Sequence, residues 1–194
     1  FEVFPDFVAD GDLRFKLAGM IVKKVVMRRQ DSRLIVHLRG EHIMGRKLMN
    51  KVAYDLKNQL FPSSLIFVSI DDSYELSSLY SLEQITKEYW NSILYEIGRM
   101  GRIEYSLISN CECGFEDNIL TLLLEDIFLA RTKSTALKEY FDNMYAHRFG
   151  REIQVGFNYT EDAKNAFYRA REHKLNLEVG LVMDQLEKQE KENE

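Results

Sequence analysis

The chain has 194 residues, of which 45% are hydrophobic and 29% are charged, and its formal net charge is -5. This composition is typical of a well-folded soluble protein and excludes a largely disordered chain, and the length allows one large domain or two small ones. No apolar run approaches the roughly 20 residues of a membrane-spanning helix, and the acidic beginning lacks the basic start of a signal peptide, so we expect a cytoplasmic protein.

Charge is distributed unevenly along the chain. Eleven Lys and Arg lie between Arg14 and Lys51 against two acidic residues, a local charge of +9, whereas the remainder has 15 basic and 29 acidic residues, a charge of -14. The basic segment suits a phosphate backbone or an acidic partner, while the acidic remainder opposes general binding to nucleic acid. A solvated strand surface is the alternative interpretation. The candidate nucleic-acid contacts are Lys23, Lys24, Arg28, Arg29, Arg33 and Arg39.

Two strand-like runs open the predicted first lobe. Residues 20–29 and 33–40 are separated by the polar turn QDS, which predicts a hairpin. In the second run, basic residues alternate with the apolar residues Leu34, Val36 and Leu38. One strand face therefore belongs to the core, and the other is solvent-exposed and basic. We expect His37 to be a surface residue on the basic face.

A helix and a third strand follow the hairpin. Residues 45–62 carry one apolar stripe at helical spacing, formed by Leu48, Val52, Leu56 and Leu60. Pro62 ends this helix, because the residue before a proline is biased away from the helical conformation. Residues 64–72 then predict a buried strand. The order of the first lobe is strand, strand, helix, strand.

The segment 81–100 contains the only tryptophan, Trp90, and predicts a helix. Ser81 and Gln84 form a capping box, in which each side chain bonds a backbone amide at the helix start. An apolar stripe runs along the whole segment, formed by Leu82, Ile85, Tyr89, Ile93 and Ile97. Such a helix must bury its stripe against a neighbour, so we expect it to join two lobes and to pack on the second sheet.

The same order of elements returns in the second half. The predicted elements are strands at 103–115 and 118–131, a helix at 134–150 and a strand at 152–159. The turn EDN separates the two strands, and Gly150 is placed to end the helix. From Thr160 onward, a threonine cap followed by acidic residues predicts a long exit helix.

These elements predict an α+β fold with two lobes, residues 1–80 and 81–194, joined by a helix. The second lobe, with the order αββαβα, resembles a type II KH domain, in which a G-x-x-G loop between two helices clamps a nucleic-acid backbone. Here Gly98 and Gly101 stand between a predicted helix and a predicted strand. We therefore expect a KH-like lobe without the clamp, in which these glycines end a helix and form a turn.

Residue types that carry catalysis or bind metals do not converge in the sequence. Cys111 and Cys113 form a C-x-C pair, but two thiols do not complete a zinc site, and the four histidines are scattered. The acidic pairs 71–72 and 125–126 are assigned to solvation, turn formation or salt bridging, because adjacent strand residues point to opposite faces. No phosphate-binding loop, nucleophile elbow or dinucleotide fingerprint is present. We expect no catalytic residue, no cofactor and no metal site.

Three runs and the charged end of the chain carry a family resemblance. The runs are "IVKKVVMRRQDSRLIVHL", "EYWNSILYEI" and "NILTLLLEDIFLARTKSTALKEYFDNMYAHRFG". Together they resemble the N-terminal region of the PolC-type DNA polymerase III alpha subunit, the replicative polymerase of low-GC Gram-positive bacteria, over residues 14–194. Because the first residue is Phe1, we expect a fragment of a longer protein. The resemblance implies a parent DNA-directed DNA polymerase with 3′–5′ exonuclease, whose catalytic parts lie outside this non-enzymatic fragment.

The resemblance also implies a role and a partner. The family's N-terminal region is similar to the C-terminal domain of the clamp-loader tau subunit and is regarded as an interaction module of the replisome. We therefore expect a protein-interaction module for DNA replication that binds tau or another replisome protein, with no membrane or small-molecule partner. The alternative, of a different class, is a DNA-contacting accessory lobe that uses the basic strands of residues 14–51.

Overall fold

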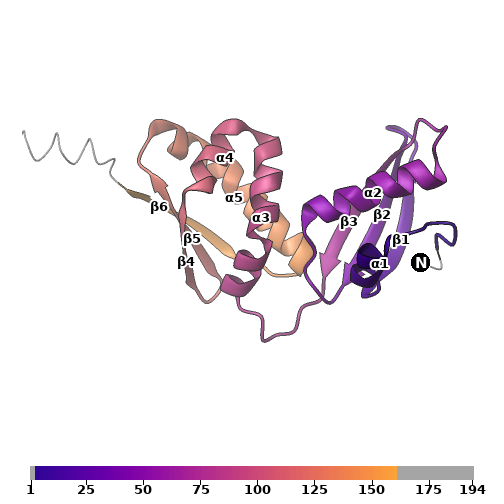
Figure 1. Ribbon diagram of the computed structural model, residues 1–194. Coiled ribbons are helices and arrows are strands. Elements are labelled where there is room, and N and C mark those ends of the chain that lie inside the picture. The colour runs from indigo at the N-terminus through magenta and orange to yellow at the C-terminus, as the bar shows by residue number, and fades with distance from the viewer. Residues whose placement is uncertain (1–2, 161–194) are drawn as a thin grey trace, which may run out of the picture.

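The computed structural model describes residues 3–160, which form a mixed α+β fold with two three-stranded sheets. The two sheets lie at opposite ends of the molecule, and two long helices, α3 (Leu82–Met100) and α5 (Phe128–Phe149), lie between them (Figure 1). The predicted α+β class is confirmed. The exit helix predicted from Thr160 onward lies outside the described residues.

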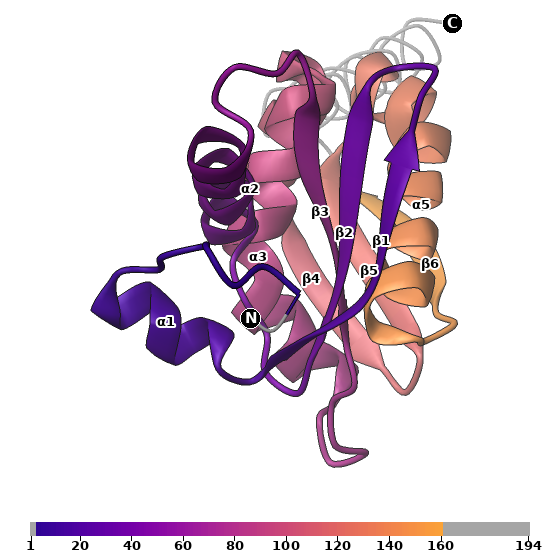
Figure 2. The same ribbon diagram turned by 90° about the vertical axis from the view of Figure 1, so that its right-hand side faces the viewer.

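The first lobe is a three-stranded sheet with one long helix on one face. Its elements are α1 (Gly11–Leu17), β1 (Met20–Arg28), β2 (Arg33–Gly40), α2 (Arg46–Leu60) and β3 (Phe67–Tyr74). Strands β1 and β2 are antiparallel, and β2 is parallel to β3. The parallel pair requires a crossover connection, which α2 supplies. Figure 2 shows α1 and α2 on the same side of this sheet.

The second lobe repeats this arrangement. Its further elements are α4 (Arg102–Ser109), β4 (Glu112–Glu116), β5 (Ile119–Glu125) and β6 (Gln154–Thr160). Strands β4 and β5 are antiparallel, β5 and β6 are parallel, and α5 forms the crossover. As predicted, Gly150 ends α5, and its φ of 60° lies in the left-handed region that glycine adopts without a steric penalty.

Helix α3 begins as the sequence predicts. The Ser81 hydroxyl accepts a hydrogen bond from the Gln84 amide at 3.1 Å, and the Gln84 side chain accepts one from the Ser81 amide at 2.8 Å. The predicted stripe is buried along the whole helix: Leu82, Ile85, Tyr89, Ile93 and Ile97. The helix ends at Gly101, whose amide donates a hydrogen bond to the Ile97 carbonyl at 3.1 Å.

The hairpins have matching turns, and β1 carries an irregularity. Ser32 and Asp117, each in the turn between two antiparallel strands, have φ values of 49° and 48°. Polar residues of this kind tolerate the left-handed conformation that such turns require. The β1–β2 register shifts between Val22 and Lys24, so Lys23 sits at a bulge in the edge strand.

The structure differs from the sequence predictions at α1, at α4 and at the start of α5. Residues 102–109 form helix α4, although Ile103, Tyr105 and Leu107 alternate with polar residues as in a strand. The buried residues of this segment are Glu104 and Ile108, four apart, which is helical spacing. The second lobe therefore starts with two helices, and the G-x-x-G stretch stands between them rather than between a helix and a strand. Helix α1 was not predicted, and α5 begins at Phe128 instead of residue 134.

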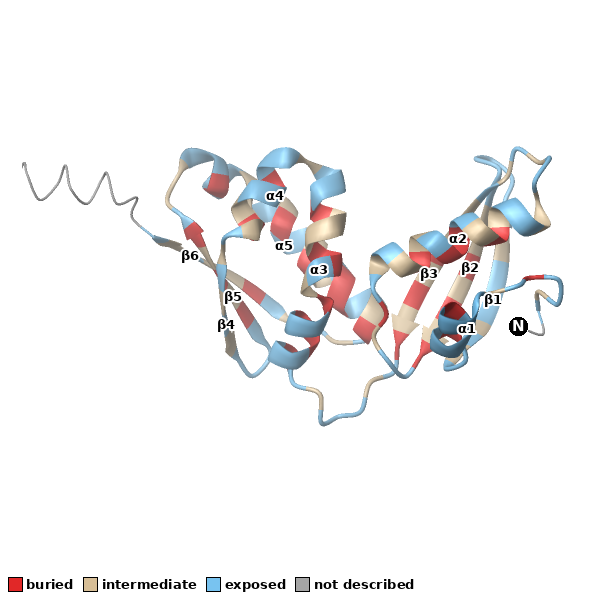
Figure 3. Ribbon diagram, viewed as in Figure 1, coloured by how far each residue is buried: buried red, intermediate tan, exposed pale blue. Residues whose placement is uncertain are grey.

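The core lies on the helix-facing side of each sheet. In the first sheet the buried strand side chains include Val36, Leu38, Ile70, Asp72 and Tyr74, and in the second they include Leu120, Leu122, Leu124 and Val155. Figure 3 shows this alternation as buried bands along β2, β3 and β5. The opposite sheet faces are covered less, which follows from the period-2 geometry of strands.

Candidate functional site

Four of the six candidate nucleic-acid contacts share one sheet face. Arg28 pairs with Arg33 in the β1–β2 register, and Lys24 pairs with His37. Arg33, His37 and Arg39 occupy alternate positions of β2, on the face turned away from the buried Val36 and Leu38. Lys23 lies at the bulge and Arg29 follows the end of β1. The structure therefore brings together Lys24, Arg28, Arg33 and Arg39 on one face, which we call the basic sheet face.

Carboxylates compensate part of this charge. Asp31 in the hairpin turn lies 3.1 Å from the Arg28 guanidinium and 3.4 Å from that of Arg33. Arg39 forms an ion pair with Glu75. Within residues 3–160, Lys23, Lys24 and Arg29 make no ion pair. The lysines and Arg29 are therefore the candidate contacts whose charge is available to a phosphate.

His37 is half-buried rather than a plain surface residue. Its Nδ1 lies 2.7 Å from Oδ2 of Asp71, the neighbouring residue on β3. Nδ1 of His147, near the end of α5, lies 3.6 Å from Oδ1 of the same aspartate. Asp71 thus contacts side chains of both lobes.

A buried ionic network joins the lobes at the end of β3, and it centres on Asp72. The Asp72 side chain is fully buried. It accepts a hydrogen bond from the Tyr74 hydroxyl at 2.7 Å and forms an ion pair with Arg46 at the start of α2. Nε of Arg148, on α5, lies 3.9 Å from Asp72 Oδ1. A buried carboxylate requires such partners, because its charge has lost its hydration.

Glu96 of α3 is the second acidic member of this network. It accepts two hydrogen bonds from Arg148, at 2.6 and 2.7 Å, and one from the Tyr140 hydroxyl at 2.8 Å. Nε of Arg46 lies 3.1 Å from it. Burial alone would raise the pKa of Glu96, but the hydrogen bonds and the charge of Arg148 outweigh it and hold the pKa below its usual value.

We call the set Arg46, Asp72, Tyr74, Glu96, Tyr140 and Arg148 the junction network. Its two cations balance its two carboxylates, and the lobes share these charges: Arg46 and Asp72 come from the first lobe, Glu96 and Arg148 from α3 and α5. Hydrogen bonds to Glu96 raise the pKa of Arg148 even though burial opposes this. Charge-assisted hydrogen bonds of this kind fix the geometry in which the two lobes meet.

Aromatic rings pack beside the junction network. The Phe149 ring stacks on Tyr74 of β3, with centroids 5.6 Å apart, and meets Tyr89 of α3 edge-on at 5.4 Å. The Arg148 guanidinium lies 5.4 Å from the centroid of the Tyr89 ring. Burial raises the pKa of Tyr74 and of Tyr89, so both phenols remain neutral. Phe149 thus connects the core of the first lobe to that of the second.

The junction network was missed in the sequence, although a signal was present. Glu96 lies seven residues after Tyr89 and three after Ile93, so it falls on the apolar stripe of α3. Arg148 stands in the same relation to Phe141 and Tyr145 on α5. A charged residue on a buried stripe predicts a paired buried charge.

The cysteines and the second acidic pair have ordinary environments. Cys113 is on β4 and Cys111 just before it, and both thiols are free and half-buried. A hydrogen bond between them raises the pKa of Cys111 and lowers that of Cys113. Asp126 contacts Arg131 at 2.8 Å. Across residues 3–160, no group of three or more His, Cys, Asp or Glu side chains is arranged to hold a metal ion.

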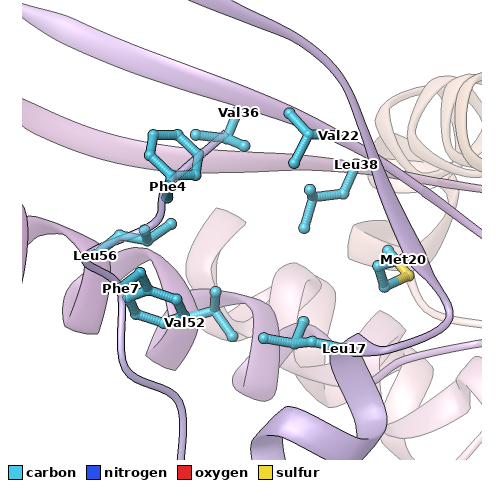
Figure 4. Close-up of a pocket in the computed structure, with 9 residues that line it drawn as sticks. All are labelled: Phe4, Phe7, Leu17, Met20, Val22, Val36, Leu38, Val52 and Leu56. Atoms are coloured by element: carbon cyan, nitrogen blue, oxygen red, sulfur yellow. The ribbon is translucent and has the colours of Figure 1, made fainter. Parts of the chain in front are cut away.

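A small cavity lies inside the first lobe. Its volume is about 40 Å³, and apolar side chains line it. Figure 4 shows Phe7 and Leu17 on one side and Val22, Val36 and Leu38 of the sheet on the other. The N-terminal segment is held there by Gln59, whose side-chain amide bonds both the amide and the carbonyl of Val8. An apolar space of this kind is a gap in core packing, without the polar groups that orient a ligand.

Comparison with known proteins identifies one family. A family model described as DNA polymerase III polC-type N-terminus II matches residues 88–194, from within α3 to the end of the chain. No curated protein and no solved structure matches the chain. In the part of the chain that the structure describes, no helix is both long enough and apolar enough to cross a membrane.

Proposed function

Because the chain belongs to the DNA polymerase III polC-type N-terminus II family, and so to the N-terminal part of a replicative DNA polymerase, we propose that it is a non-catalytic protein-interaction module of the replisome. The clamp-loader tau subunit is the proposed partner. In this proposal, the polymerase and 3′–5′ exonuclease activities reside in other parts of the parent protein. The family match over the second lobe is the observation that carries the proposal.

The surface of the second lobe supports a protein partner. Phe128, the first residue of α5, is 82% exposed, and Leu129 next to it is also exposed. Met100 and Ile103 expose further apolar area at the corner between α3 and α4. Large exposed apolar side chains are costly in water unless a partner covers them, and aromatic residues are enriched among the residues that dominate protein interfaces.

The direct test is a calorimetric titration of the 194-residue chain with the purified C-terminal domain of tau, at low and at physiological salt. We expect saturable binding at a defined stoichiometry at both salt concentrations. Phe128→Ser should weaken the binding about tenfold or more, as expected for an aromatic anchor.

Phe15→Ser is the matched control. Phe15 lies on α1 of the first lobe and is 82% exposed, like Phe128. The Phe15→Ser variant should bind the C-terminal domain of tau with unchanged affinity. Absence of heat with every purified replisome component would refute the proposal, and equal losses in the two variants would refute the placement of the interface on the second lobe.

The basic sheet face favours a second candidate function, a DNA-contacting accessory lobe. Its support is the common orientation of Lys24, Arg28, Arg33 and Arg39. The charge available to DNA is smaller than the sequence implies, since Asp31 and Glu75 pair with the three arginines. Binding through this face would therefore depend on the two lysines and on Arg29.

This second function predicts a measurable salt dependence. The affinity for duplex DNA should fall with salt, with a slope of log affinity against log salt of about -0.9 per phosphate contact. The triple variant Lys23→Gln, Lys24→Gln, Arg29→Gln should flatten that slope. The control variant Lys87→Gln, Lys133→Gln, Lys138→Gln makes the same charge change on the second lobe. It should show the salt slope of the unmodified chain. Absent or salt-insensitive binding to DNA would exclude this function.

A further inference from the structure

An open pocket of about 690 Å³ lies where the start of α2 meets α3 and α4. Figure 1 shows this end of α2 turned toward α3. The contacts between the helices fix its walls: the Arg46 amide donates to the Ser92 hydroxyl at 3.0 Å, and the Asn50 side chain donates to the Tyr95 hydroxyl at 3.1 Å. We call this space the α2–α3 pocket.

The α2–α3 pocket is cationic although the chain as a whole is acidic. Arg46, Lys47 and Arg99 line it, and no acidic residue is among its lining residues. Arg46 forms ion pairs with Asp72 and Glu96 of the junction network. Lys47 and Arg99 are exposed, and neither forms an ion pair within residues 3–160. Two uncompensated cations at one concave site attract an anion more strongly than isolated surface charges do.

Aromatic rings border these cations. Lys47 Nζ lies 5.7 Å from the centroid of the Tyr95 ring, which places the cation beside the pocket wall. The Tyr105 ring lies against Gly98, where an added Cβ would be 3.3 Å from the ring. The absence of a side chain at Gly98 therefore lets this ring rest on the backbone of α3. Tyr105 is nevertheless 44% exposed, so part of the ring remains open to the pocket.

We propose that the α2–α3 pocket binds a nucleotide unit, with the phosphate at Lys47 and Arg99 and the base on the ring of Tyr105. Paired cations and a positioned, partly exposed aromatic ring are the two elements by which proteins hold single-stranded nucleic acid without base-specific hydrogen bonds. Ser92 and Asn91 add polar groups to the same wall. This inference is independent of the proposed contact with a replisome protein, and it uses none of the basic-sheet-face residues.

The test is fluorescence anisotropy of a labelled single-stranded oligothymidylate of about ten nucleotides, titrated with the whole chain at several salt concentrations. Lys47→Gln and Arg99→Gln should each weaken binding and make the salt slope shallower by about 0.7, the value for one phosphate contact to a single strand. Tyr105→Leu should weaken binding about tenfold without changing the slope, because it removes stacking and no charge.

Matched variants provide the controls. Arg102→Gln removes an exposed cation next to the pocket but outside its lining, and Tyr54→Leu removes an exposed tyrosine from α2. Both should bind like the unmodified chain. Equal losses in Arg102→Gln and Arg99→Gln, or no binding by the unmodified chain, would overturn the proposal.

Competition identifies the form of the ligand. Displacement by free thymidine monophosphate at a similar affinity would support a single-nucleotide site, and much weaker displacement would support a strand. Displacement by polyglutamate as effective as by thymidine monophosphate would overturn the nucleotide assignment and identify an acidic peptide as the ligand. Loss of tau binding in Phe128→Ser together with normal oligothymidylate binding would separate this inference from the proposed function.

Discussion

Replacing Arg148 with methionine should lower the free energy of unfolding by about 3–5 kcal/mol, the range for removing one partner of a buried ion pair. The substitution keeps a long side chain but leaves Glu96 without its two strongest hydrogen bonds, at 2.6 and 2.7 Å. It also removes the cation beside the Tyr89 ring. Urea denaturation followed by the fluorescence of the single tryptophan, Trp90 on α3, measures the change.

Lys138→Met is the control for this prediction, because Lys138 lies on the same helix and pairs with Asp142 in an exposed bridge. Its loss should cost less than about 1 kcal/mol, as surface ion pairs do. If Arg148→Met and Lys138→Met had equal effects, the junction network would not stabilise the fold in the way its geometry indicates.

Phe149→Ala should also cost about 3–5 kcal/mol, the range for truncating a buried phenylalanine. The Phe149 ring touches Tyr74 of the first lobe and Tyr89 and Tyr145 of the second, so the truncation opens a cavity between the two lobes. We expect scanning calorimetry to show a lower melting temperature together with a broader transition, because the lobes would lose cooperative contact.

Phe128→Ala, at the exposed beginning of the same helix, tests whether the effect belongs to the junction. It should remain within about 0.5 kcal/mol of the unmodified chain, because surface substitutions seldom exceed this. A single sharp transition in Phe149→Ala, at an unchanged temperature, would show that the lobes do not communicate through this ring.

The order of helices and strands followed from local periodicity. The stripe of α3 and the alternation of β2 and β5 each involve neighbouring residues of one element, and burial agrees with them at Ile93, Val36 and Leu122. The strand predicted over α4 failed because Ile103 and Tyr105, which alternate as in a strand, remain partly exposed at the surface. The segment is a helix because Glu104 and Ile108, four residues apart, pack against the rest of the protein. A short hydropathy pattern does not reveal such tertiary contacts.

The junction network and the α2–α3 pocket depend on residues far apart in the sequence. Arg46 and Glu96 are fifty residues apart, and Lys47 and Arg99 are similarly distant. The sequence does not show which acidic residue a given cation will pair with, so the roles of Arg46 and Lys47 could not be predicted from it. In the structure the cations of the basic segment have three different positions. Arg46 belongs to the junction network, Lys47 lines the α2–α3 pocket, and Lys24 lies on the basic sheet face.

The position of Asp72 has a consequence for synthesis of the protein on the ribosome. Its partners Arg46 and Tyr74 belong to the first lobe, so all three residues have been made once translation reaches residue 74. At about 5–20 residues per second, Arg148 follows roughly 4–15 s later. Arg46 and Tyr74 are therefore available to pair with Asp72 before Arg148 of α5 has been synthesised.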